Sequence, residues 1–142
     1  MRPRGLIDTG AILALLDRDD RWHQPCEQAF RSVPLPLATT SAVLCELFHL
    51  VGDDDRAVDA AWTFIHSGAV RLEIIGHDEL PALQALMRKH VDRPMDFADA
   101  SLVHIAGRES LGLVFTIDRA DFETYRWAGR RRFRIVPDSP AR

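Results

Sequence analysis

The order of apolar and polar positions along the chain predicts strands that alternate with helices. Short apolar runs predict strands at 5–8, 70–75, 113–117 and 134–136. Helical spacing of apolar residues predicts helices at 10–16, 25–31, 41–51, 54–66, 78–90, 96–109 and 122–127. Capping residues support two of these helices: Thr40 or Ser41 and Asp53 or Asp54 at their starts, with Gly52 and Gly68 beyond their ends.

This alternation predicts an α/β fold. Strands separated by helices indicate a central parallel sheet, here of four to five strands, flanked by helices on both faces. The chain of 142 residues has the length of one domain and contains neither repeat nor linker, so we expect a single domain over residues 1–142. Because such sheets bind ligands outside the carboxyl ends of their strands, residues at those ends are the first candidates for a site.

Composition and the start of the chain indicate where in the cell the protein is expected. No stretch approaches the roughly 20 apolar residues that span a bilayer. The basic start of the chain precedes an apolar run that Asp8 interrupts and that stops at Asp17, which is too short for a secretory signal. The two cysteines form neither a disulfide framework nor a zinc motif. We therefore expect a cytoplasmic protein without a membrane partner.

Two acidic residues directly follow predicted strands. Asp8 ends the first strand, and Asp118 follows the strand at 113–117. Since parallel strands end at the same edge of a sheet, both carboxylates are expected at the edge where sites form. Either residue alone is equally well explained as a turn residue or a helix N-cap, but together they favour a site.

Asp99 is expected on a buried helix face. At about 100° per residue, the apolar face of the helix at 96–109 consists of Ala98, Leu102, Ile105 and Ala106, and Asp99 lies within it. Ser101, His104 and Arg108 are expected on the opposite, solvated face. A carboxylate on a buried face is costly unless it is paired, hydrogen-bonded or bound to a metal, so Asp99 is a candidate ligand.

Two other acids are ambiguous from the pattern alone. Asp96 is either a further metal ligand or the N-cap of a capping box, in which Asp99 reaches back to its backbone amide. Glu46 lies at the border of the core-facing side of the helix at 41–51, where a glutamate is more commonly solvated than bound to a ligand.

The candidate site therefore has four acids: Asp8, Glu46, Asp99 and Asp118. Two like charges about 4 Å apart repel by about 4 kcal/mol at an effective dielectric constant of about 20, so such a set takes up protons or binds hard cations. Mg²⁺ and Mn²⁺ prefer oxygen ligands, typically bind beside phosphates, and can activate water for phosphodiester cleavage. The neighbouring Thr9 and Thr116 can hold a water or a carboxylate, or serve as ordinary turn hydroxyls.

Basic residues gather near the end of the chain. A net charge of −3 argues weakly against a nonspecific nucleic-acid binder, but the total hides this distribution. Candidates for phosphate contacts are Arg130, Arg131, Arg132 and Arg134. A solvated edge strand explains the same residues. We expect an acidic pocket beside a basic rim.

Four motifs resemble those of the PIN-domain ribonucleases, and within them the VapC-type toxins of toxin–antitoxin pairs. They are Leu6-Ile7-Asp8-Thr9, Ser41-Ala42-Val43-Leu44-Cys45-Glu46-Leu47, Asp96-Phe97-Ala98-Asp99-Ala100-Ser101-Leu102 and Thr116-Ile117-Asp118-Arg119-Ala120-Asp121-Phe122. Each is short, but the ordered set spans residues 6 to 122. The resemblance implies Glu46 as the second acid, Mg²⁺ or Mn²⁺ as cofactor, RNA as substrate, a homodimer and a cognate antitoxin.

The resemblance leaves one departure and two alternatives. Gly10 stands where many relatives carry a small polar residue. One alternative is a catalytically silent PIN domain that binds RNA or a partner protein. The other is a phospho-accepting receiver domain, which needs a lysine late in the chain, whereas the only lysine here is Lys89. We predict a metal-dependent endoribonuclease that uses a metal-activated water.

Overall fold

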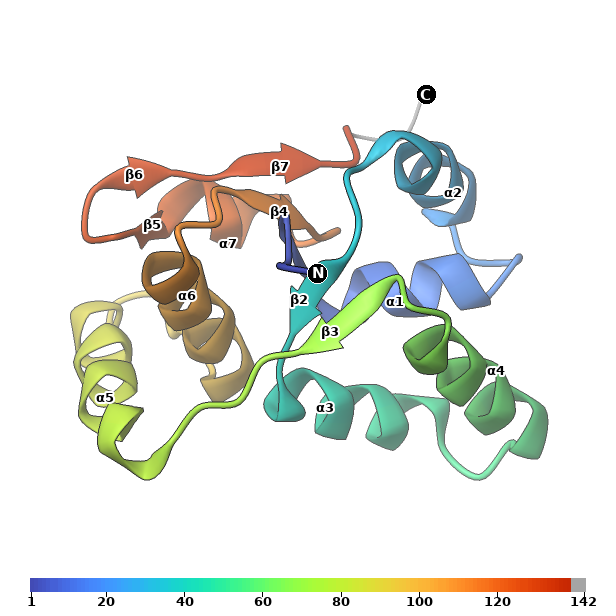
Figure 1. The fold of residues 1–142 in the computed structure, drawn as a ribbon, viewed down its shortest axis with the longest axis horizontal. Helices are drawn as coiled ribbons and strands as arrows, with labels where there is room; N and C mark the ends of the chain where they lie inside the picture. The colour runs from blue at the N-terminus through green and yellow to red at the C-terminus, as the bar shows by residue number, and fades with distance from the viewer. Residues whose placement is uncertain (139–142) are drawn as a thin grey trace.

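A computed structural model describes residues 1–138 and confirms the expected α/β architecture around a parallel sheet. Figure 1 shows the sheet with its flanking helices; the five strands have the spatial order β3-β2-β1-β4-β7, and every neighbouring pair is parallel. Their bounds are β1 Leu6–Ile7, β2 Leu37–Thr39, β3 Val70–Leu72, β4 Leu113–Phe115 and β7 Arg134–Val136. Residues 139–142 of the expected domain lie outside the described part.

Helices cover both sides of the sheet. Their bounds are α1 Thr9–Leu16, α2 His23–Ser32, α3 Ser41–Val51, α4 Asp55–His66, α5 Leu80–Lys89, α6 Phe97–Glu109 and α7 Arg119–Thr124, with a 3₁₀ turn η1 at His77–Glu79. Helix α1 packs against α2 and α3, whereas α5 packs against α6 (Figure 1). No helix within residues 1–138 has the length and apolar character needed to cross a membrane.

Strand β1 is the central strand of the sheet. Leu6 and Ile7 have no exposed surface, because β2 and β4 flank the strand and helices cover its faces. Helix α1 follows at once, and its residues Ala11, Ile12 and Ala14 are also fully buried. The first acid of the candidate site, Asp8, therefore lies between two buried segments of the chain.

Some predicted elements were wrong or missing. The sequence pattern did not predict β2, because three residues are too few to show a period. The helix predicted at 122–127 begins and ends earlier, as α7, and is followed by a two-stranded antiparallel hairpin of β5 Arg126–Trp127 and β6 Arg131–Arg132. The hairpin turns through Ala128 and Gly129, both with positive φ, a conformation that is not visible from apolar spacing.

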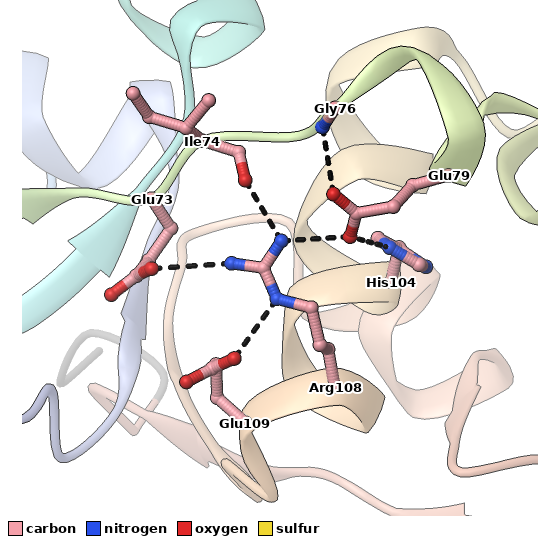
Figure 2. A network of polar contacts seen from close by, with 7 residues as sticks. All are labelled: Glu73, Ile74, Gly76, Glu79, His104, Arg108 and Glu109. Atoms are coloured by element: carbon pink, nitrogen blue, oxygen red, sulfur yellow. Dashed lines mark hydrogen bonds and ion pairs between the residues drawn. The ribbon is translucent and has the colours of Figure 1, made fainter.

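A polar network fixes the loop after β3 to the outer face of α6 (Figure 2). Its members are Glu73, Ile74, Gly76, Glu79, His104, Arg108 and Glu109. The Arg108 guanidinium donates to Glu79 Oε1 at 2.7 Å and to the Ile74 carbonyl at 2.8 Å. Hydrogen bonds from His104 and then Arg108 lower the pKa of Glu79 to about 2. His104 and Arg108, predicted to be solvated, are thus partly covered by this loop.

Gly10 allows a close contact between the first turn of α1 and the segment after β4. A Cβ atom at this position would lie 2.8 Å from Ile117 Cγ1 and 2.9 Å from Ile117 Cδ1. This contact brings the start of α1 against the residue that precedes Asp118. The absence of a side chain at Gly10 therefore has a packing reason.

We expect Gly10→Ala to lower the free energy of unfolding by about 1–3 kcal/mol, because overpacking forces Ile117 to move. Urea unfolding followed by circular dichroism measures the change. Gly107→Ala is the matched control, since its Cβ would be 3.4 Å from its nearest neighbour and alanine favours a helix interior. A Gly10→Ala protein as stable as the Gly107→Ala protein would contradict the packing role.

Candidate active site

Asp8 and Asp118 stand at the carboxyl ends of the neighbouring strands β1 and β4, as predicted. The Asp8 amide donates to the Phe115 carbonyl at 3.0 Å. The hydroxyl of Thr116 links the two acids: it donates to Asp8 Oδ2 at 3.1 Å and accepts from the Asp118 amide at 3.0 Å. Thr116 thus fixes Asp8 and the main chain at Asp118 relative to each other, which is consistent with a supporting role.

The Asp8 carboxylate is almost completely buried, with 3% of its surface exposed. Its second oxygen, Oδ1, accepts from the Thr9 amide at 2.7 Å at the start of α1. Burial raises the pKa of Asp8 to about 7, the Thr9 amide opposes the shift, and repulsion from Asp118 and Glu46 adds to it. In the metal-free protein the protonated and ionised forms of this carboxyl group are therefore comparably populated at neutral pH.

Buried hydroxyl groups connect the helices that carry the other acids. The Thr9 hydroxyl donates to the Val43 carbonyl of α3 at 3.4 Å, so it holds a helix rather than a carboxylate. Thr40, the N-cap of α3, lies 2.7 Å from the Ser101 hydroxyl of α6. Ser101 has no exposed surface, so its predicted place on the solvated face was wrong. These bonds join α1, α3 and α6 next to the acids.

Asp99 lies in the first turn of α6 and is half-buried. Its Oδ2 accepts a hydrogen bond of 2.9 Å from the hydroxyl of Tyr125. Burial raises the pKa of Asp99 to about 8, with repulsion from Asp8 and Asp96 as the next causes, whereas the Tyr125 hydroxyl opposes the shift. The pKa of Tyr125 is raised by burial and by the charge of Asp99, so its proton stays in place as the donor.

Asp96 caps α6. Its Oδ1 accepts from the Asp99 amide at 2.8 Å, and its side chain is exposed. The reciprocal bond of a capping box is replaced, because the Asp99 carboxylate bonds to Tyr125 instead. One oxygen of Asp96 is thus already used by the helix, which favours the capping role over the ligand role.

The remaining acids lie near this pair. Glu46 on α3 is half-buried and raises the pKa of both Asp8 and Asp118 by repulsion. Asp118 is exposed as a residue, but its carboxyl group is partly shielded from water. This partial shielding, and then repulsion from Asp121 and Glu46, raises the pKa of Asp118. These pairwise repulsions indicate that acids from four separate motifs lie near enough to one another to interact through space.

The carboxylates supply only oxygen donors, which is the chemistry that Mg²⁺ and Mn²⁺ prefer. Within residues 1–138, no group of three or more His, Cys, Asp or Glu side chains is arranged to hold an ion by itself. Mg²⁺ usually keeps several waters and binds through one or two carboxylates together with substrate phosphates. The donor set therefore fits a hydrated ion better than an all-protein cage.

Two site residues were missed from the sequence. Asp121 repels Asp99, Asp118 and the Tyr125 phenolate, and its Oδ1 lies 3.2 Å from Arg93 Nη2. Three-residue spacing from Asp118 on a short helix would have indicated Asp121. Nothing in the sequence indicated Tyr125, because its contact with Asp99 joins residues 26 positions apart.

The C-terminal arginines lie around the start of β7, away from the strand ends that carry the acids. Arg134 pairs with Leu113 at the start of β4, which is the edge of the sheet opposite to Asp8 and Asp118. The hairpin turn is also distant, because Ala128 lies against Gly107, eight residues along α6 from Asp99 or about 12 Å. The direction of β7 therefore places Arg134 at the opposite edge of the sheet from Asp8 and Asp118, and a basic rim beside the acids stays a prediction.

Comparison with known proteins decides the family, since the sequence profile of the PIN domain matches residues 5–128. The chain belongs to the PIN-domain family. Ribonuclease VapC26 of Mycobacterium tuberculosis is 30% identical over 135 residues, which cover 93% of this chain and 99% of that protein. This relative confirms the predicted VapC-type membership.

A solved structure supports the same PIN fold. The crystal structure of Mycobacterium tuberculosis VapC20, described as a toxin that cleaves the sarcin–ricin loop, superposes with a TM-score of 0.72. It is 24% identical, and the match covers 82% of this chain and 92% of that chain. Membership of the PIN family also removes the receiver-domain alternative.

The raised pKa values predict an unusual pH dependence for the metal-free protein. Because Asp8 and Asp99 titrate near 7 and 8 when folded but near 3.8 when unfolded, the folded state binds more protons. Stability from these groups is therefore highest below about pH 4 and is lost as pH rises to about 8. Asp99→Asn should be more stable than wild type at pH 9, and this gain should disappear toward pH 4.

Thermal unfolding with a chelator between pH 4 and pH 9 measures this dependence. Asp59→Asn, which changes an exposed carboxylate on α4, is the control and should show no such gain. An Asp99→Asn protein that is less stable than wild type at pH 9 would contradict the raised pKa.

Proposed function

We propose that this PIN-domain protein is an endoribonuclease that needs Mg²⁺ or Mn²⁺. The observation that carries the proposal is the pair of acids Asp8, which is buried, and Asp99, which is half-buried and whose pKa is raised first by burial and then by repulsion from Asp8. Such repulsion is costly unless a proton or a cation relieves it. The name of the relative VapC26 as a ribonuclease supports RNA as the substrate.

The four acids have graded roles in this proposal. Asp8 and Asp99 are the main ligands, because both are withdrawn from water and close enough to repel each other. Glu46 and Asp118 orient water molecules at the edge of the pocket, and Thr116 holds Asp8 in place. A divalent ion, when bound, neutralises phosphate charge and activates water for in-line attack.

The cellular role proposed here is that of the toxin in a toxin–antitoxin pair. VapC20, which shares the fold, is described as a toxin that cleaves the sarcin–ricin loop. A cognate antitoxin would restrain this chain by covering the acidic pocket, and the active form would be a homodimer in the cytoplasm, where RNA is available. A small open reading frame beside the gene would support the antitoxin.

Asp8→Asn and Asp99→Asn should each lower the rate of RNA cleavage in Mn²⁺ by about 100-fold or more, because even the loss of a ligand's outer partner costs about 10–100-fold. Cleavage of labelled RNA, with and without Mn²⁺, measures the effect. Asp59→Asn is again the control. Full activity of either pocket variant would refute the site; a wild-type chain that binds RNA without cleaving it would support the silent PIN alternative.

The C-terminal arginines are proposed to contact RNA phosphates at a distance from the cut. We expect the double variant Arg130→Gln/Arg132→Gln to bind RNA more weakly and to reduce the slope of log affinity against log salt by about 1.4, or about 0.7 for each lost phosphate contact. Arg56→Gln/Arg71→Gln, which changes exposed arginines elsewhere, is the matched control. An unchanged slope would identify the segment as a solvated edge.

A further inference from the structure

Tyr125 is a fully buried phenol whose single polar atom meets an acid of the pocket. It is the largest side chain of the fully buried core, and its hydroxyl donates to Asp99 Oδ2 at 2.9 Å. A phenylalanine would fill the same space without this donor. The hydroxyl therefore has a purpose beyond packing, since a buried polar group is tolerated only where it is hydrogen-bonded.

The ring of Tyr125 is held rigidly from two sides. It packs edge-on against Phe122, with ring centroids 5.2 Å apart and planes at 76°. His90 contacts it in the same manner, at 5.1 Å and 84°. Two perpendicular neighbours restrict the tilt of the ring, so the position of the hydroxyl oxygen is set by the core.

The backbone at Tyr125 is also anchored. Its amide donates to the Asp121 carbonyl at 3.0 Å, which closes the last turn of α7. The Arg126 guanidinium donates to the carbonyls of Glu123, Thr124 and Tyr125 at 2.8, 3.0 and 3.0 Å. The donor to Asp99 thus comes from a fixed point of the fold.

On the other side of the bond, Asp99 has no second side-chain donor among residues 1–138. Its backbone amide is used by the Asp96 cap, which fixes the main chain but leaves the carboxylate free to rotate. The Tyr125 hydroxyl removes that freedom by holding Oδ2, so that Oδ1 remains available. A preset orientation lowers the entropic cost of binding a ligand.

We propose that Tyr125 is a positioning residue, which orients the Asp99 carboxylate for a divalent cation in the pocket. The inference rests on the proposed function for the identity of the ligand. In this proposal Tyr125 affects the affinity for the cation only through its hydrogen bond to Asp99. Partners that orient metal ligands typically contribute about 10–100-fold in affinity.

A double-mutant cycle tests this coupling. Mn²⁺ is titrated into wild type, Tyr125→Phe, Asp99→Asn and the double variant, and the signal of free Mn²⁺ is followed by electron paramagnetic resonance. Tyr125→Phe should weaken Mn²⁺ binding by about 10–100-fold, and should change it by less than about twofold in the Asp99→Asn background. Wild-type affinity in Tyr125→Phe, or the same loss in both backgrounds, would overturn the proposal.

A matched variant separates positioning from packing. Trp127→Phe removes the Trp127 Nε1 donor to the Arg132 carbonyl, a bond of 3.2 Å in the adjacent hairpin and away from the acids. It should lower the melting temperature while it leaves Mn²⁺ affinity unchanged. Tyr125→Phe should weaken Mn²⁺ binding and should lower the melting temperature less than Trp127→Phe does.

Different results would overturn the proposed function and the role of Tyr125. A wild-type chain that neither binds Mn²⁺ nor cleaves RNA would overturn the proposed function and this inference together. A wild-type chain that does both, with Tyr125→Phe equal to it in Mn²⁺ affinity, would overturn the inference alone.

Discussion

The burial of the Asp8 carboxylate at the end of the central strand is the constraint on which the rest of the structure depends. A charged group at this depth is costly, and it is tolerated because both of its oxygens accept hydrogen bonds, from the Thr9 amide and the Thr116 hydroxyl. Those donors exist only if α1 begins at Thr9 and β4 ends beside β1. Gly10 permits both, since it lets α1 approach Ile117.

Helix α6 joins this constraint to the remainder of the molecule. On its outer face, Arg108 and its carboxylate partners hold the loop before α5 (Figure 2). On its inner face, the buried hydroxyl of Ser101 meets Thr40, the cap of the helix that carries Glu46. Its first turn then presents Asp99 toward Asp8. A helix fixed on two faces keeps its first turn, and with it the main chain at Asp99, in a defined place.

The distribution of charge follows from the same geometry. Acids gather at the carboxyl edge of the sheet because strands and helices from four motifs meet there. Burial, and then repulsion between these acids, raises the pKa of Asp8 and Asp99. The arginines before and within β7 lie toward the opposite edge, since this strand runs parallel to β4. Asp8, Glu46, Asp99 and Asp118 form no ion pair with a basic side chain among residues 1–138, whereas Asp121 pairs with Arg93.

The sequence by itself determined the alternation of strands and helices, the parallel sheet, and the strand-end positions of Asp8 and Asp118, because these follow from local periodicity and from a general rule about sheet edges. The helical spacing also placed the Asp99 carboxylate on the apolar face of its helix, where a charge is unfavourable without a partner. Only the tertiary structure decided that Asp96 caps α6, that Ser101 is buried, and that Tyr125 holds Asp99. The local spacing allows Asp96 more than one role, and it cannot indicate a contact such as that of Tyr125 with Asp99, because these residues are 26 positions apart and meet only once the chain has folded.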